Sequence, residues 1–107
     1  MKLESIGEVI AERVLHLSRD GGESRLVTVR LGKPQQYPDG NGYFCPYEIT
    51  AADYRKAFYA AGLDSMQALR LTLRMVSVEL HALRRDGHPD MYFDEPGDDM
   101  GFPEEVF

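Results

Sequence analysis

Cys45 is the single cysteine of the chain and the first candidate for a catalytic role. A thiol nucleophile needs a base beside it, and His16 is the one histidine in the part of the sequence where we predict strands. No glycine-x-cysteine elbow surrounds Cys45, and a free cysteine more often behaves as a small, buried apolar residue. We therefore predict a structural role for Cys45.

Glu79 is the second candidate, because it lies within the apolar surface of the helix that we predict for residues 65–85. A carboxylate buried alone has a raised pKa, which is one way in which proteins make a general acid. The alternative is a carboxylate that pairs with an arginine or a tyrosine at the rim of the core, or across an oligomer interface. Since the sequence identifies no second catalytic group for Glu79, we predict the paired carboxylate.

Metal-binding patterns are weak in this sequence. The three histidines are far apart, and no pair of Cys or His residues has the spacing of a zinc site. Two groups near the C-terminus could gather around a hard cation: Asp86, His88 and Asp90, or Asp94, Asp98 and Asp99. Solvated acids are the simpler interpretation of both groups. We predict no metal, no cofactor and no catalytic residue.

The helix predicted for residues 65–85 carries a basic face. The residues that project together, at spacings of three, four or seven, are Arg70, Arg74, His81, Arg84 and Arg85. They could hold phosphate groups or the acids of a protein partner. The alternatives are a solvated face whose arginines complement the helix dipole, or a face that the acidic end of this chain or of a neighbour covers.

The charge of the chain is divided unevenly. All 12 lysines and arginines precede residue 86, so the net charge of −6 comes from the acids of residues 86–107. Aromatic residues, among them Tyr92, Phe93 and Phe102, alternate with these acids and could contact a partner. We treat residues 1–85 as one domain and residues 86–107 as an acidic aromatic tail. Because a basic excess is missing, nucleic-acid binding through the helix arginines is unlikely compared with protein binding.

The size and composition are those of one globular domain. The chain has 107 residues, of which 43% are hydrophobic and 28% charged. One cysteine cannot form an internal disulfide, the N-terminal residues lack the apolar core of a signal peptide, and no apolar stretch could cross a membrane. We expect a cytoplasmic protein that is not bound to a membrane.

The first two strands are predicted to form a hairpin. Residues 8–18 fit both helical and strand spacing, but a strong turn sequence, Asp20-Gly21-Gly22, follows them. Residues 25–31 then alternate, with Val27, Val29 and Leu31 on one face. A strand, a tight turn and a second strand make a hairpin, so we predict strands on both sides of the turn.

Two further segments complete the expected sheet. Residues 32–42 are rich in Gly and Pro and are predicted to form a loop. Residues 43–50 are predicted to form a strand at an edge or with a bulge, because Pro46 cannot donate a hydrogen bond to a neighbouring strand. Residues 54–60 fit either a fourth strand or a helical turn.

The helix is the clearest element in the sequence. Asp64 is a good N-cap, Gln67 completes a capping-box spacing, and no Gly or Pro occurs from Ser65 to Arg85. Its apolar residues form two stripes, the first made of Met66, Leu69, Leu73, Val76, Leu80 and Leu83, the second of Leu71, Met75, Val78 and Ala82. A sheet covers one stripe only. We therefore expect the second stripe to be covered by a loop, by the tail or by another protein chain.

Three groups of residues resemble a known family. They are Gly32-Lys33-Pro34, then Tyr43-Phe44-Cys45-Pro46-Tyr47-Glu48-Ile49, then Gly62-Leu63-Asp64-Ser65-Met66-Gln67-Ala68-Leu69. Together they resemble a small, uncharacterised bacterial domain family with a CPYEI motif and a GxDSxQAL helix start, over roughly residues 9–83. The resemblance brings no known activity, cofactor or site residue. The layout is also similar, in fold alone, to HicB-type antitoxin domains, although their strand pattern and DNA-binding segment are missing here.

These observations predict an α+β fold in which a three- or four-stranded antiparallel sheet packs against one long helix. We expect the chain to be a non-enzymatic protein-interaction module, similar to an immunity protein or an antitoxin. Its partner would be a second copy in a homodimer or another protein. The alternatives are a small-molecule-binding domain or enzyme built on Glu79, Cys45 and His16 with the glycine-rich loop 39–42, and nucleic-acid binding through the helix arginines.

Overall fold

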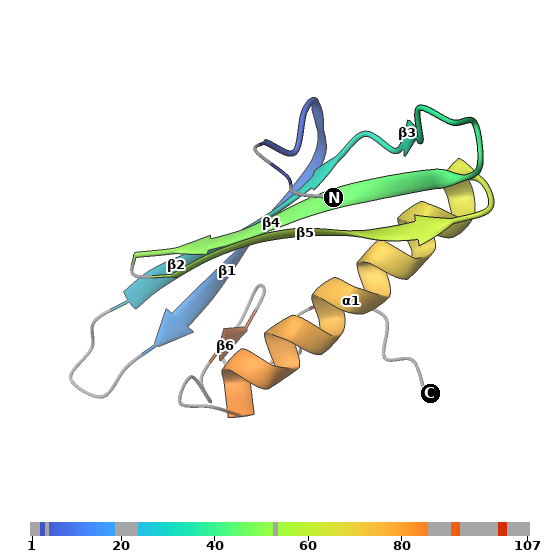
Figure 1. The fold of residues 1–107 in the computed structure, drawn as a ribbon. Helices are drawn as coiled ribbons and strands as arrows, with labels where there is room; N and C mark the ends of the chain where they lie inside the picture. Colours follow the sequence, from blue (N-terminus) through green and yellow to red (C-terminus); the bar gives the residue numbers. More distant parts are fainter. Residues whose placement is uncertain are drawn as a thin grey trace.

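The computed structural model describes residues 3, 5–18, 24–52, 54–85, 91–92 and 101–102. These residues form one antiparallel sheet and one long helix that packs on a single face of the sheet (Figure 1). In chain order the elements are β1 (Val9–Ser18), β2 (Ser24–Gly32), β3 (Gln35–Gln36), β4 (Tyr43–Ala51), β5 (Tyr54–Gly62), α1 (Ser65–Arg85) and β6 (Met91–Tyr92). The predicted α+β fold is confirmed.

The sheet is built around β4. Along its whole length β4 pairs with β5 on one side, and on the other side it pairs with β2 and with the short strand β3. Beyond β2 lies β1, which in turn pairs with β6. Three of the four long strands are those that the sequence predicts, and residues 54–60, which fit either a strand or a helical turn, belong to the fourth, β5. The two-residue strands β3 and β6 were not predicted, because so short a segment has no readable alternation.

The predicted hairpin is present. The pairing of β1 with β2 runs from Ser18 opposite Ser24 to Val9 opposite Gly32, with an irregularity between Val9 and Ala11. The strand interpretation of residues 8–18 is therefore correct. The predicted turn at residues 20–22 lies outside the part of the chain that the structure describes.

Pro46 was expected to mark an edge strand or a bulge. The edge position is wrong, and where a bulge was the alternative, the structure has a break between two partner strands. Strand β4 is interior, and Pro46 pairs in regular register with Tyr59 of β5. On the other side, β2 pairs with β4 as far as Tyr47, and β3 pairs only with Tyr43 and Phe44. Pro46 thus occupies the gap between two partner strands. An interior strand tolerates its missing N–H there, because the ladder is interrupted at that point.

The hydrophobic core lies between the sheet and α1. Alternation places every second residue of each strand on the helix-facing side. The fully or almost fully buried side chains of the main cluster are Leu15, Val27, Val29, Leu31, Tyr47 and Ile49 from the sheet, with Val76 and Leu80 from the helix. The predicted apolar face of β2 is therefore the inward one.

The other face of the sheet carries a row of alternating charges. Glu12 of β1 pairs with Arg30 of β2 (2.7 Å), Arg30 with Glu48 of β4 (3.6 Å), and Glu48 with Arg55 of β5 (2.8 Å). The strand register brings each charge next to the opposite one on the neighbouring strand. Each of these partly exposed ion pairs contributes little to the free energy of folding. Together they agree with an antiparallel sheet that has one face toward solvent.

The start of α1 follows its predicted cap closely. The Gln67 N–H donates to Asp64 Oδ1 (2.7 Å), and the first helical bond runs from the Ala68 N–H to the Asp64 carbonyl (3.1 Å). The Gln67 side chain reaches back one residue further than in the usual capping box, because its Oε1 accepts from the Leu63 N–H (2.6 Å).

The helix meets the sheet along a seam that joins two residues of the first apolar stripe, Val76 and Leu80, to Ala68 and Thr72 beside them. The residues closest to the sheet are Ala68, Thr72, Val76 and Leu80, all of them fully buried. The Thr72 hydroxyl accepts from the Ala60 N–H (3.2 Å) and donates to the Cys45 carbonyl (2.6 Å), so it joins the helix to β5 and β4. Met66, assigned to the first stripe, is 78% exposed.

Candidate functional site

A groove runs between α1 and β5, which among the described residues is an edge strand paired with β4 alone. We call it the α1–β5 groove. Its volume is about 570 Å³, and the residues that line it are Phe58, Tyr59, Ala60, Ala61, Leu71, Arg74, Met75, Val78 and Glu79. Two of its apolar side chains reach far into solvent, since Phe58 is 42% and Val78 50% exposed. The groove therefore contains Leu71, Met75 and Val78 of the second apolar stripe, for which the sequence predicted a cover.

The position of this groove follows from the way in which α1 lies over the sheet. Helix α1 packs on β4 and β5 (Figure 1). Because the seam residue Thr72 faces the sheet, Leu71, Met75 and Val78 are turned toward the free edge of β5. Alternation along β5 puts Phe58 on the same side of the sheet as the helix, opposite Tyr47. The apolar rim is thus made by one helix stripe and one strand residue.

The polar groups of the groove are paired at its rim. Lys56 of β5 donates to Glu79 of α1, whose side chain is 24% exposed. Glu79 is therefore a paired carboxylate, as predicted, although its partner is a lysine rather than an arginine or a tyrosine. The catalytic role considered for Glu79 requires a carboxylate buried alone, and this carboxylate is neither alone nor fully buried.

The Tyr47 hydroxyl is the unusual group beneath this pair. Tyr47 is fully buried, and its hydroxyl has no hydrogen-bond partner among the described residues. Burial raises the pKa of Tyr47 to about 12, and the nearby charge of Glu79 and then Tyr54 add to the effect. A phenol that holds its proton this tightly is not a nucleophile at neutral pH.

We expect Tyr47→Phe to leave the free energy of unfolding at pH 7 unchanged or to raise it by up to about 1 kcal/mol, because no hydrogen bond is lost. Above pH 10 the wild type also loses folding stability, because the hydroxyl of Tyr47 ionises more readily in the unfolded chain. An unfolded tyrosine ionises near pH 10 and the folded one only near 12, so the stability due to Tyr47 is complete below pH 10 and lost as the pH rises toward 12.

Urea unfolding of the wild type and Tyr47→Phe, at pH 7 and between pH 9.5 and 11.5, measures the two free energies of unfolding. The wild type should lose more stability with rising pH than Tyr47→Phe does. The comparison with the variant removes the contributions of Tyr37 and Tyr54, whose pKa values burial also raises. A loss of more than about 1 kcal/mol in Tyr47→Phe at pH 7 would mean that the hydroxyl has a partner.

Cys45 and His16 do not come together. Cys45 is fully buried on the helix-facing side of β4, and its thiol lies 3.5 Å from the Gly32 carbonyl. Burial raises the pKa of the Cys45 thiol, an effect that a hydrogen bond with Thr72 partly opposes. His16 belongs to β1, which β2 separates from β4, and pairs with Leu26 on the opposite face of the sheet. A cysteine–histidine pair cannot form from these positions.

The predicted basic face of α1 is only partly a single surface. Arg74 lines the α1–β5 groove, whereas Arg70 and His81 are exposed on the helix. His81 Nδ1 lies 2.7 Å from the Ser77 carbonyl. Each of Arg70, Arg74, His81 and Arg84 already has an interaction partner in the structure.

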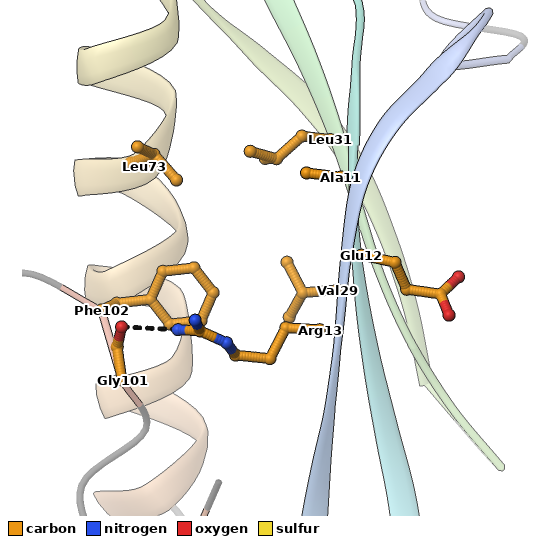
Figure 2. Close-up of a pocket in the computed structure, with 8 residues that line it drawn as sticks. All are labelled: Ala11, Glu12, Arg13, Val29, Leu31, Leu73, Gly101 and Phe102. Atoms are coloured by element: carbon orange, nitrogen blue, oxygen red, sulfur yellow. Dashed lines mark hydrogen bonds between the residues drawn. The ribbon is translucent and has the colours of Figure 1, made fainter.

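A second hollow lies on the helix side of β1 and β2 (Figure 2). It has a volume of about 260 Å³, and its walls are formed by Ala11, Glu12, Arg13, Val29, Leu31, Leu73, Gly101 and Phe102. The Arg13 guanidinium donates to the Gly101 carbonyl and lies 4.8 Å from the centre of the Phe102 ring. Phe102, half-buried, also packs against the core cluster.

Two described pieces of the acidic tail thus lie on the body of the same chain. Gly101 and Phe102 contact Arg13, and Met91 and Tyr92 pair with β1 opposite Leu17 and His16. Phe102 covers part of the inner sheet face that α1 leaves open, because α1 packs on β4 and β5. The other tail residue predicted to contact a partner, Phe93, lies outside the described residues.

Neither hollow combines the residues of the predicted small-molecule site. Of Glu79, Cys45, His16 and the loop 39–42, Glu79 alone lines one of them. No group of three or more His, Cys, Asp and Glu side chains with metal-binding geometry occurs within the residues that the structure describes. The acidic groups proposed around Asp86 and Asp94 fall outside those residues.

The sequence pointed to the helix half of the α1–β5 groove, since Leu71, Met75 and Val78 were predicted to need a cover. It did not point to Phe58. The alternation of β5 could have indicated the face on which Phe58 lies, but the position of β5 at the sheet edge depends on strand order.

Within the described residues, no helix is long and apolar enough to cross a membrane.

Comparison with known proteins adds a family. No curated protein and no solved structure matches the chain. Residues 11–104 match a family described as a domain of unknown function, DUF6968. The match reaches beyond residue 83, where the resemblance seen in the sequence ended, and so takes in most of the acidic tail. The chain therefore belongs to the DUF6968 family.

Proposed function

We propose that this chain is a non-enzymatic protein-interaction module and that the α1–β5 groove is its binding surface. The observation that carries the proposal is the exposure of Phe58 and Val78 on opposite sides of one apolar groove. Scattered exposed apolar residues are ordinary on protein surfaces. A contiguous apolar groove beside a free sheet edge is a common feature of protein-binding sites.

The edge strand strengthens this proposal. Within the described residues β5 pairs with β4 alone, so one side of a nine-residue strand has no partner. Such an edge presents unpaired backbone N–H and C=O groups and is normally blunted by charges, prolines or a bulge. The stretch from Ala57 to Ala61 contains no charge and no proline. Strand addition at this edge would bring an added strand directly against the groove.

The candidate catalytic groups support a binding role over an enzymatic one. Cys45 and His16 lie on opposite faces of the sheet, and Glu79 keeps Lys56 as its partner. An immunity- or antitoxin-like role is the specific form that we propose, because a net charge of −6 suits a chain that masks a basic partner. A lone, buried thiol agrees with a bacterial cytoplasm as its location.

The test compares affinity capture by the wild type and two variants with matched exposure. Val78→Glu places a charge in the groove, whereas Leu26→Glu places one on the open face of the sheet, where Leu26 is 54% exposed. We expect a stoichiometric protein partner, which can be another copy of the chain, to bind wild type and Leu26→Glu and to bind Val78→Glu at least about ten-fold more weakly. Equal capture by Val78→Glu would contradict the proposal.

A further inference from the structure

We propose that the partner at the α1–β5 groove is a second copy of the chain, whose β5 pairs antiparallel with β5 of the first across a two-fold axis at Phe58. The inference rests on the proposed function, because it uses the same surface. It goes further in naming the occupant, the pairing register and the residues that meet. Three features of β5 carry it: the direction of its backbone groups, its midpoint and the placement of its charges.

The direction of the free backbone groups follows from Pro46. Pro46 pairs with Tyr59 and has no N–H to give, which suits a pair that exchanges no hydrogen bonds. Because such pairs alternate with hydrogen-bonded ones, Tyr59 directs its N–H and C=O to the free edge, as do Arg55, Ala57 and Ala61. The neighbouring Ala60 agrees, since its N–H points to the β4 side, where the Thr72 hydroxyl links it to the Cys45 carbonyl.

The midpoint of the strand then selects the register. A two-fold axis between two identical antiparallel strands must pass beside one residue and its own copy. Phe58 is the central residue of Tyr54–Gly62. With the axis there, Ala57 faces Tyr59 of the second copy and Arg55 faces Ala61, so all four outward-directed residues find partners within the strand. An axis moved one residue either way leaves one of them opposite a residue beyond the end of β5.

The charges of the strand do not repel one another in this register. Arg55 faces Ala61 and Lys56 faces Ala60 of the second copy, so basic residues meet small ones and no two like charges stand opposite each other. The two Phe58 side chains lie side by side on the helix face. Directly opposite residues that exchange no hydrogen bonds are the closer pairs in an antiparallel ladder. Val78 and Met75 of both helices flank the two rings, so the exposed apolar groove becomes the centre of the interface.

The first experiment measures the molar mass of the purified chain by light scattering at high micromolar concentration. We expect twice the chain mass of 12.1 kDa for the wild type. Phe58→Lys, which sets two ammonium groups against each other at the axis, should have the mass of one chain and an unchanged circular dichroism spectrum. The control Met66→Lys, at a position 78% exposed near the start of α1, should stay dimeric. A monomeric wild type, or a dimeric Phe58→Lys, would overturn the proposal.

Cross-linking tests the register without relying on a disruptive charge. In a Cys45→Ala background, Phe58→Cys should form an intermolecular disulfide on mild oxidation, because residue 58 meets its own copy. Arg55→Cys should not, because two copies of residue 55 lie six residues apart in register, roughly 20 Å along the strands. Equal cross-linking at both positions, or none at residue 58, rejects this register.

The two proposals can fail separately. A wild type that is monomeric alone but captures a different protein in a manner sensitive to Val78→Glu leaves the interaction module standing and removes the second copy. A homodimer that persists in Val78→Glu and in Phe58→Lys removes both the register and the groove as the interaction surface.

Discussion

Replacing Thr72 with valine is expected to lower the free energy of unfolding by about 2–4 kcal/mol. Valine has nearly the shape of threonine, so the packing at this fully buried position is kept. The loss comes from two hydrogen bonds, since the Ala60 N–H and the Cys45 carbonyl both lose their contact with the hydroxyl. A buried polar group left without a partner costs about 1–3 kcal/mol, and here two such groups are left.

Urea or thermal unfolding of the wild type, Thr72→Val and Thr72→Ser measures the effect. Serine keeps the hydroxyl and deletes one methyl group, so its loss should be near 1 kcal/mol, the size of one buried methylene or methyl. The order of stability is then wild type, Thr72→Ser, Thr72→Val. If valine proved as stable as serine or more so, the hydroxyl would not be what joins α1 to β4 and β5.

Replacing Gly32 with alanine should cost about 3 kcal/mol or more. A Cβ at this position would lie 2.2 Å from the Ile6 carbonyl oxygen and 2.7 Å from Pro46 Cγ. Both distances are shorter than non-bonded contacts allow. Neither neighbour can move freely, because one is backbone and the other is a ring within the interior strand β4. Overpacking of this kind costs 1–3 kcal/mol, and more where the neighbours are fixed.

Gly40→Ala is the control, because it also replaces a glycine with alanine but produces no steric clash. Gly40 has φ of +78°, and the nearest atom to an added Cβ is the flexible Gln36 Nε2 at 4.0 Å. Its cost should be that of a left-handed backbone alone, about 1–2 kcal/mol. Chemical denaturation of both variants decides the matter, and a Gly32→Ala protein no less stable than Gly40→Ala would show that the segment around Ile6 does not pack against Gly32.

These two positions fix different parts of the scaffold, and Thr72 is the one that bears on the place of the groove. Thr72 fixes the rotation of α1 about its axis, and this rotation turns Leu71, Met75 and Val78 toward the edge of β5. Gly32 lets the N-terminal segment approach β2 and Pro46, at the point where the chain leaves β2 for β3. Neither residue lines the α1–β5 groove itself.

The separation of candidate catalytic residues could not be read from the sequence. Cys45 and His16 were considered as a pair because they are the only thiol and the only histidine of the strand region. Which face His16 occupies depends on its register with β2, and its distance from Cys45 depends on which strand lies between them. Both are decided by long-range pairing.

The sequence by itself determined the local elements of this protein. The cap at Asp64, the helix from Ser65 to Arg85, the alternation of β2 and the α+β class all follow from residues a few positions apart, whose hydrogen bonds and side-chain periodicity act over one turn or one strand. The second helix stripe that needs a cover follows from the same periodicity.

Only the tertiary structure decided how these elements are assembled. It placed β4 inside the sheet despite Pro46, left β5 at an edge, turned the seam at Thr72 toward the sheet, and set Phe102 on Arg13. Local patterns show which face of a strand is apolar, but they do not show which strand lies beside it. That order is set by contacts between residues far apart in the chain, which form only when a particular packing buries the most apolar surface and leaves the fewest backbone groups unpaired.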